Sequence, residues 1–125
     1  MNKTAKFLSL IGVVFGIVTI ISGGSVLFGS NPGYVVFFPL VVFNTIMGFA
    51  YISTGIMVWW NIVRSKTMAG IIFLLNLSAL ILISYLYWIG SDIANQSLGA
   101  MSFRSVVWMI IYFSLTRVIS KKSRN

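Results

Sequence analysis

The sequence predicts an all-α integral membrane protein, a four-helix transmembrane bundle with both termini in the cytoplasm. Of its 125 residues, 58% are hydrophobic and only 8% are charged, whereas a soluble domain is about 25% charged. The charged residues also lie between long apolar segments, and the stretch 7–63 contains none. Because one transmembrane helix needs about 20 apolar residues, this stretch alone holds two spans and a turn.

The turn residues and the charges together delimit four spans in a single transmembrane domain, 1–125. A turn is predicted at Asn31-Pro32-Gly33, because Pro presets φ and Gly permits a positive φ. Pro39, near the start of the second span, either begins the regular helix or kinks it. Arg64-Ser65-Lys66 is read as a short basic connection between the second and third spans. The four spans are then about 7–28, 34–63, 68–90 and 103–119.

The segment 91–102 is more polar than the spans on either side. We read it as a loop, with a short interfacial helix as the alternative. Asp92 and Arg104 flank the eleven residues 93–103 and can pair across them, and an exposed pair of this kind contributes little to stability. The last span is short, so Arg104 and Arg117 are expected at its opposite interfaces, where long basic side chains reach water.

The first span has a second interpretation, a cleaved signal peptide. A basic start, an apolar stretch and the small residues 22–25 fit such a segment. The apolar residues continue through Phe28, however, beyond the usual hydrophobic region of about 7–15 residues. A retained helix is therefore the favoured interpretation.

The basic residues predict the topology. One side carries eight of the nine: Lys3, Lys6, Arg64, Lys66, Arg117, Lys121, Lys122 and Arg124. The other side carries only Arg104. Because cytoplasmic loops are enriched in Lys and Arg, both termini should face the cytoplasm, and a bacterial inner membrane is the expected location. The net charge of +8 then indicates contact with anionic lipid headgroups, and nucleic acid is not an expected partner.

Missing residue types narrow the possible chemistry. The chain has no His and no Cys, and a single Asp is its only acidic residue. It therefore lacks the imidazole and thiolate groups of common nucleophiles and metal ligands, and the paired carboxylates of acid–base catalysis. We expect no cofactor, no metal site and no enzymatic activity.

Small residues recur on one face of the first span. They are spaced alternately three and four residues apart, so they share one stripe of a helix: Ser9, Gly12, Gly16, Thr19 and Gly23. Small residues let helix backbones approach closely in lipid. Packing within the bundle is the simplest interpretation, and an interface between copies of the chain or a ligand groove is the alternative.

Two amide side chains, those of Asn44 and Asn76, lie inside predicted spans, and Tyr51 shares the helix stripe of Asn44. An amide in hydrocarbon is costly unless it is hydrogen-bonded, so both should face the bundle interior. One interpretation is a pair of interhelical hydrogen bonds. The other is a polar cavity or permeation path lined by Asn44, Tyr51 and Asn76.

The stretch 44–51, followed by Thr54-Gly55, Ala69-Gly70 and Asn76-Leu77, resembles the second and third helices of DoxX-like small four-helix membrane proteins. This resemblance covers about half of the chain and implies a four-helix bundle without a defined chemistry. Small multidrug transporters have a similar size, but they depend on a membrane-embedded Glu, which this chain lacks.

The sequence leaves two functions open. The first is a non-enzymatic accessory or assembly subunit of a membrane complex or homo-oligomer, which the apparent lack of charge within the spans favours. The second is a small transporter, channel or lipid-handling protein for a neutral or anionic solute, acting through Asn44 and Asn76.

Overall fold

The computed structural model describes residues 3–29, 37–90, 93 and 95–124. These residues form four helices, α1 (Lys3–Leu27), α2 (Phe38–Trp60), α3 (Ile62–Trp88) and α4 (Asn95–Arg124). Each helix is long and apolar enough to cross a membrane. The prediction of an all-helical protein with four candidate spans is therefore confirmed. The predicted turn at 31–33 lies outside the described residues.

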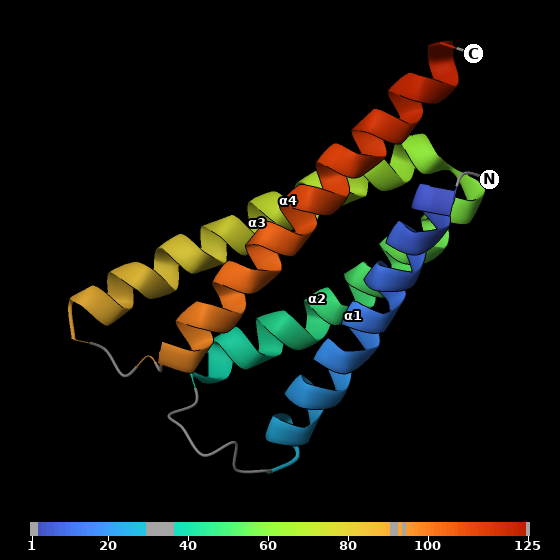
Figure 1. Ribbon diagram of the computed structural model, residues 1–125. Helices are drawn as coiled ribbons and strands as arrows, with labels where there is room; N and C mark the ends of the chain where they lie inside the picture. Colours follow the sequence, from blue (N-terminus) through green and yellow to red (C-terminus); the bar gives the residue numbers. More distant parts are fainter. Residues whose placement is uncertain (1–2, 30–36, 91–92, 94, 125) are drawn as a thin grey trace.

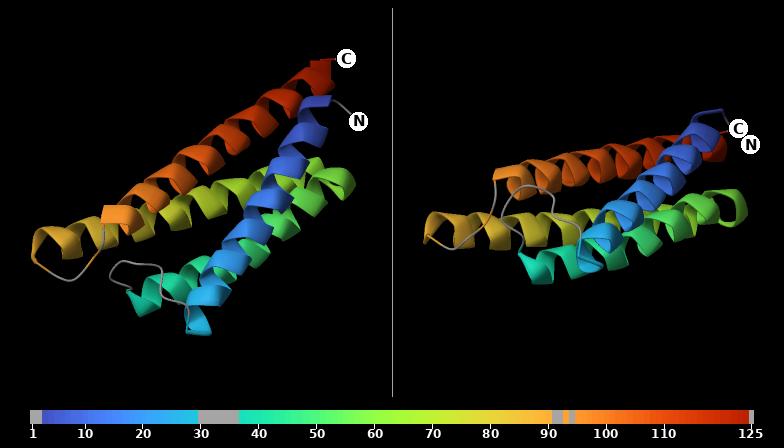
Figure 2. Two further views of the ribbon diagram at one scale, coloured as in Figure 1. Left: turned by 60° about the horizontal axis from the view of Figure 1, so that its bottom comes forward. Right: turned by 90° about the horizontal axis from the view of Figure 1, so that it is seen from below.

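The helices form two hairpins (Figure 1). α1 packs along α2, α3 packs along α4, and the α2–α3 contact joins the two pairs. α1 and α4 meet over a shorter stretch and diverge away from the termini (Figure 2). Both termini lie at the same end of the bundle as the α2–α3 connection. This arrangement leaves one side of the bundle less tightly packed than the others.

The second span is divided differently from the prediction. Pro39 lies in the first turn of α2, where its missing N–H has no helical partner to lose, so it begins the helix. α2 ends at Trp60, and Asn61 adopts an extended conformation with φ −151°. The Asn61 side chain accepts a hydrogen bond of 3.1 Å from the Arg64 N–H, which caps the start of α3. The predicted basic connection at 64–66 is therefore the first part of α3, and the prediction was wrong there.

The fourth helix begins earlier than predicted. α4 starts at Asn95 and runs for 30 residues, so the segment that we read as a loop is helical from Asn95 onward. Its Asn, Gln and Ser residues form a polar first turn, where such side chains can bond exposed backbone N–H groups. Arg104 consequently lies nine residues, or about 14 Å, along the helix. Arg104 is therefore not at the end of its helix, whereas its place at a membrane interface stays a prediction.

All four helices contribute to one buried polar and aromatic centre. The Tyr51 ring of α2 stacks on the Trp108 ring of α4 with centroids 4.9 Å apart, and the Phe15 ring of α1 lies 5.5 Å from Tyr51. The Tyr51 hydroxyl donates a 3.2 Å hydrogen bond to Oδ1 of Asn76 on α3. Tyr51, Trp108 and Asn76 are fully buried. This centre holds the two hairpins together.

Candidate functional site

The small-residue face of α1 lies mainly against α2 of the same chain. The Ser9 hydroxyl donates a 2.6 Å hydrogen bond to the Gly55 carbonyl, and Gly12 faces the Gly55 backbone. A Cβ atom added to Gly16 would lie 2.6 Å from the Gly48 carbonyl oxygen. This face is therefore occupied by packing within the bundle, which leaves little of it for a contact between copies.

The last two members of that face lie farther along α1. Gly23 faces Thr45 of α2. Thr19 is also buried, and its hydroxyl donates a 2.7 Å hydrogen bond to the Phe15 carbonyl. Thr19 additionally lines a cavity on the α4 side of the helix, so the face reaches the edge of the α1–α4 gap.

The structure separates the three residues that the sequence grouped into one polar cavity. Tyr51 and Asn76 bond one another in the buried centre. Asn44 instead lines a small cavity of about 70 Å³ together with Ser97 and Arg104 of α4. Its buried Oδ1 atom has no hydrogen-bond partner among the described residues. The Tyr51–Asn76 pair thus fits interhelical hydrogen bonding, and Asn44 belongs to a different site.

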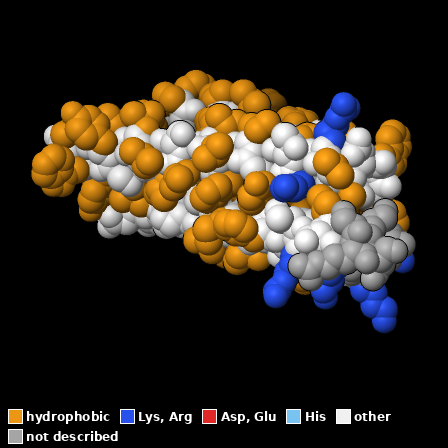
Figure 3. All heavy atoms as spheres, turned by 90° about the horizontal axis from the view of Figure 1, so that it is seen from above, with side chains coloured by type: hydrophobic (Ala, Val, Ile, Leu, Met, Phe, Trp, Pro, Cys, Tyr) orange, Lys and Arg blue, Asp and Glu red, His pale blue; other side chains and the backbone are white. Residues whose placement is uncertain are grey.

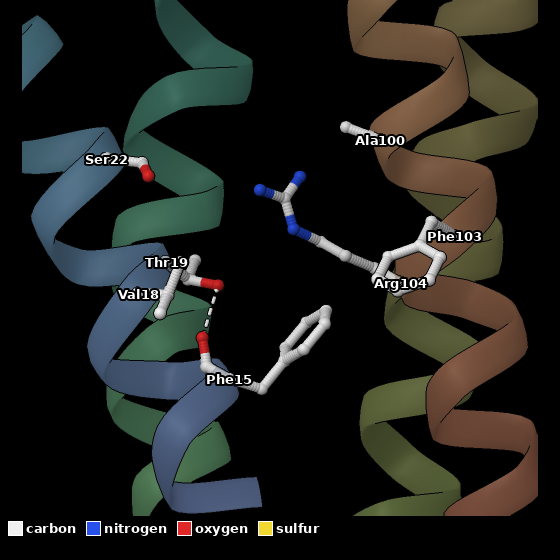
Figure 4. A pocket seen from close by; sticks show the side chains of 7 residues that line it. All are labelled: Phe15, Val18, Thr19, Ser22, Ala100, Phe103 and Arg104. Atoms are coloured by element: carbon white, nitrogen blue, oxygen red, sulfur yellow. Dashed lines mark hydrogen bonds between the residues drawn. The ribbon is translucent and has the colours of Figure 1, made fainter. Parts of the chain in front are cut away.

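That site is a cleft between α1 and α4, centred on Arg104. Its main cavity has a volume of about 180 Å³ and is lined from both helices: Phe15, Val18, Thr19, Ser22, Ala100, Phe103 and Arg104. Figure 4 shows the Arg104 guanidinium extending away from α4 toward α1 and α2, and the side-chain oxygens of Thr19 and Ser22 on the α1 side of the cavity. The cleft therefore combines a cation with neutral hydrogen-bonding groups.

An apolar groove of about 440 Å³ adjoins this cavity. Both share Phe15, Val18 and Phe103 as lining residues. Only apolar side chains line the groove: Leu10, Ile11, Val14, Phe15, Val18 and Phe103. Leu10 is 60% exposed and Phe103 is 62% exposed, so the groove is open on the outer surface of the bundle. We call the cavity and the groove together the α1–α4 cleft.

Sequence reasoning missed Arg104 because the polar segment before it resembled a loop. An uninterrupted helix from Asn95 would have placed its side chain well inside the bundle, and no proline or turn pair argues against such a helix. The proposed partner of Arg104, Asp92, lies outside the described residues. Arg104 does make an interaction within the chain.

No protein-family model, curated protein or solved structure matches the chain. The resemblance to DoxX-like proteins therefore stays a prediction. The function of the α1–α4 cleft has to be argued from its own geometry.

Proposed function

We propose that the protein is a non-enzymatic integral membrane protein that binds an anionic solute in the α1–α4 cleft, as a small transporter or lipid-handling protein does. The observation that supports this most strongly is the position of Arg104 inside α4, with its guanidinium in the cavity. Charged side chains within membrane spans are costly and often mark substrate or ion pathways. A guanidinium binds carboxylate or phosphate oxygens through a fork of N–H donors.

We expect Arg104 to lie within the hydrocarbon layer, on the basis of the helix lengths. At a rise of 1.5 Å per residue, a layer of about 30 Å covers roughly 20 residues. If α4 is centred in the bilayer, Arg104 lies about 7 Å inside the edge of that layer. The same estimate for α2 puts Asn44 at about the same depth. The two side chains that line the small cavity are thus at a common level.

The surroundings of Arg104 favour an anion. The main cavity and the small cavity beside it are lined, besides Arg104, by the hydroxyl and amide groups of Thr19, Ser22, Asn44 and Ser97. Hydroxyl and amide groups can donate further hydrogen bonds to an anion. A guanidinium has five N–H donors, so Arg104 can keep its partner within the chain and still bind a solute.

A binding experiment tests this proposal. Methyl phosphate is titrated into the full-length protein in nanodiscs of phosphatidylcholine, and binding is measured by calorimetry. Arg104→Gln should weaken binding at least about tenfold, because hydrogen bonds to a charged group contribute about 1.5–3 kcal/mol. Arg104→Lys keeps the charge but loses the fork, so an intermediate affinity is expected.

Arg117→Gln is the matched control, since Arg117 also lies in α4 but outside the cleft. It should bind methyl phosphate like the wild type. An accessory or assembly subunit, the other function predicted from the sequence, needs no solute. Affinities that are equal in the wild type and Arg104→Gln, or no binding by either, would contradict the proposed function.

We also propose an inner-membrane location with both termini in the cytoplasm. The described basic side chains other than Arg104 belong to the two termini and the start of α3, which lie at one end of the bundle (Figure 1), and Figure 3 shows Lys and Arg gathered toward one end. Such an excess marks the cytoplasmic side. Green fluorescent protein fused to the C-terminus should fluoresce, and alkaline phosphatase fused there should be inactive. The reverse result would overturn this topology.

A further inference from the structure

We infer that the solute is an anionic amphiphile, which enters the α1–α4 cleft sideways from the bilayer. Its carboxylate or phosphate head lies at Arg104, and its chain lies in the apolar groove. This inference rests on the proposed function and names the class of solute.

The composition of the cleft changes from one end to the other. Arg104 lines the cavity beside the hydroxyls of Thr19 and Ser22. The adjoining groove carries only apolar side chains. A small inorganic anion would use the first part and leave the second without a role. A charged head with a hydrocarbon chain matches both parts.

The groove also runs in the direction that a lipid chain takes. From Thr19 back to Leu10, α1 covers nine residues, or about 14 Å. Since α1 spans Lys3–Leu27, this segment leads from the level of Arg104 past the middle of the helix. One leaflet of hydrocarbon is about 15 Å thick, half of the bilayer core. With its head at Arg104, about 7 Å inside the edge of the hydrocarbon layer, a chain that follows this segment for about 14 Å crosses the midplane of the bilayer.

The groove is a shallow, open site for a hydrocarbon chain. It has a volume of about 440 Å³, and Leu10, Val18 and Phe103 on its walls are each more than half exposed. A chain can therefore lie along the groove while it remains in contact with the bilayer. Amphiphiles with one chain, a fatty acid or a monoalkyl phosphate, are the simplest probes of such a site.

Entry from the side follows from the exposure of the groove. Leu10, Val18 and Phe103 are each more than half exposed, so these walls face the bilayer when the helices span it. The apolar groove of the cleft thus opens directly to lipid. A chain already lying in the leaflet can slide between α1 and α4 without passing through water.

The experiment compares a small anion with two amphiphiles. The full-length protein is placed in phosphatidylcholine nanodiscs with dodecyl phosphate or dodecanoate, each carrying a photoreactive diazirine near the end of its chain. Crosslinks are expected on α1 between Leu10 and Val18 and on Phe103 of α4. Arg104→Gln should reduce crosslinking at these positions about tenfold, by loss of the head contact. Comparing the two probes shows which head group the cleft prefers.

A variant that fills the groove tests the contribution of the hydrocarbon chain separately from that of the head group. Val14 is 49% exposed and lines the groove, so Val14→Trp should block the chain while the bundle still folds. Crosslinking of both amphiphiles should fall about fivefold or more, the loss that about 1 kcal/mol produces. Methyl phosphate has no hydrocarbon chain and is expected only in the cavity at Arg104, which Val14 does not line. Its binding should therefore stay at the wild-type level, which also verifies the fold. Leu74→Trp, at a side chain 60% exposed on α3, is the matched control and should leave both measurements unchanged.

The outcomes distinguish failure of the amphiphile inference from failure of the proposed anion-binding function. Methyl phosphate binding that depends on Arg104, combined with amphiphile crosslinks that are unaffected by Val14→Trp or lie outside the groove, would overturn the amphiphile inference and leave the proposed function standing. Methyl phosphate binding that does not depend on Arg104 would overturn both. Loss of groove crosslinking in Val14→Trp with methyl phosphate binding retained would support both.

Discussion

Replacing Gly16 with leucine should separate α1 from α2 and leave the bundle unfolded at temperatures where the wild type is stable. Even the first carbon of a side chain at Gly16 would lie 2.6 Å from the Gly48 carbonyl oxygen and 2.9 Å from the Ile52 backbone nitrogen. These are backbone atoms of α2, so the two helices must move apart. Overpacking of a core costs about 1–3 kcal/mol, and a leucine against backbone should reach or exceed the upper value.

Gly24→Leu on the same helix is the matched control, because a Cβ atom there meets nothing within 4 Å. Thermal unfolding in detergent, followed by circular dichroism and by retention on size-exclusion chromatography, measures both variants. Gly24→Leu should unfold within a few degrees of the wild type. If Gly16→Leu were as stable as Gly24→Leu, the close α1–α2 contact would be contradicted.

Removing the Trp108 side chain should be the most damaging change in the centre of the bundle. The ring is fully buried and stacks on Tyr51, with centroids 4.9 Å apart. Replacing a buried Trp with Ala costs about 3–5 kcal/mol in protein cores. The indole N–H of Trp108 has no hydrogen-bond partner among the described residues, so the loss comes from packing.

Trp88→Ala provides the comparison, because that side chain is 83% exposed and should lose less than about 1 kcal/mol. Unfolding of both variants in mixed micelles with increasing dodecyl sulfate gives the difference in the free energy of unfolding. Equal losses for the two tryptophans would show that the stacked centre does not hold the hairpins together.

The number of helices followed from the sequence, whereas several of their boundaries did not, above all the starts of α3 and α4. Charge-free stretches are a reliable sign of candidate spans because each must match the thickness of a membrane. We read Arg64 and Lys66 as a connection because they are charged, but Asn61 caps α3 just before them. The polar residues after Asn95 misled us in the same way. Local polarity alone does not distinguish a helix end from a loop.

The arrangement of the helices explains why the cleft was missed. The small-residue face of the first span was visible in the sequence, and the structure pairs its Gly12 and Gly16 with Gly55 and Gly48 of α2. The divergence of α1 from α4 has no such local signal, because it results from the packing of all four helices. It is this divergence that puts Arg104 beside Thr19 and Asn44 and leaves Asn76 in the centre.

The central claim, an anion held by Arg104, is tested most directly at the guanidinium itself. The chain has only four arginines: Arg64, Arg104, Arg117 and Arg124. Labelling with ¹⁵N-arginine therefore gives four side-chain Nε–Hε signals in an NMR spectrum, and the signal missing from Arg104→Gln identifies Arg104. Titration with methyl phosphate in nanodiscs should shift the Arg104 signal at concentrations that leave the other three unchanged. An Arg104 signal that does not move, or that moves only together with the other three, would contradict the proposed function.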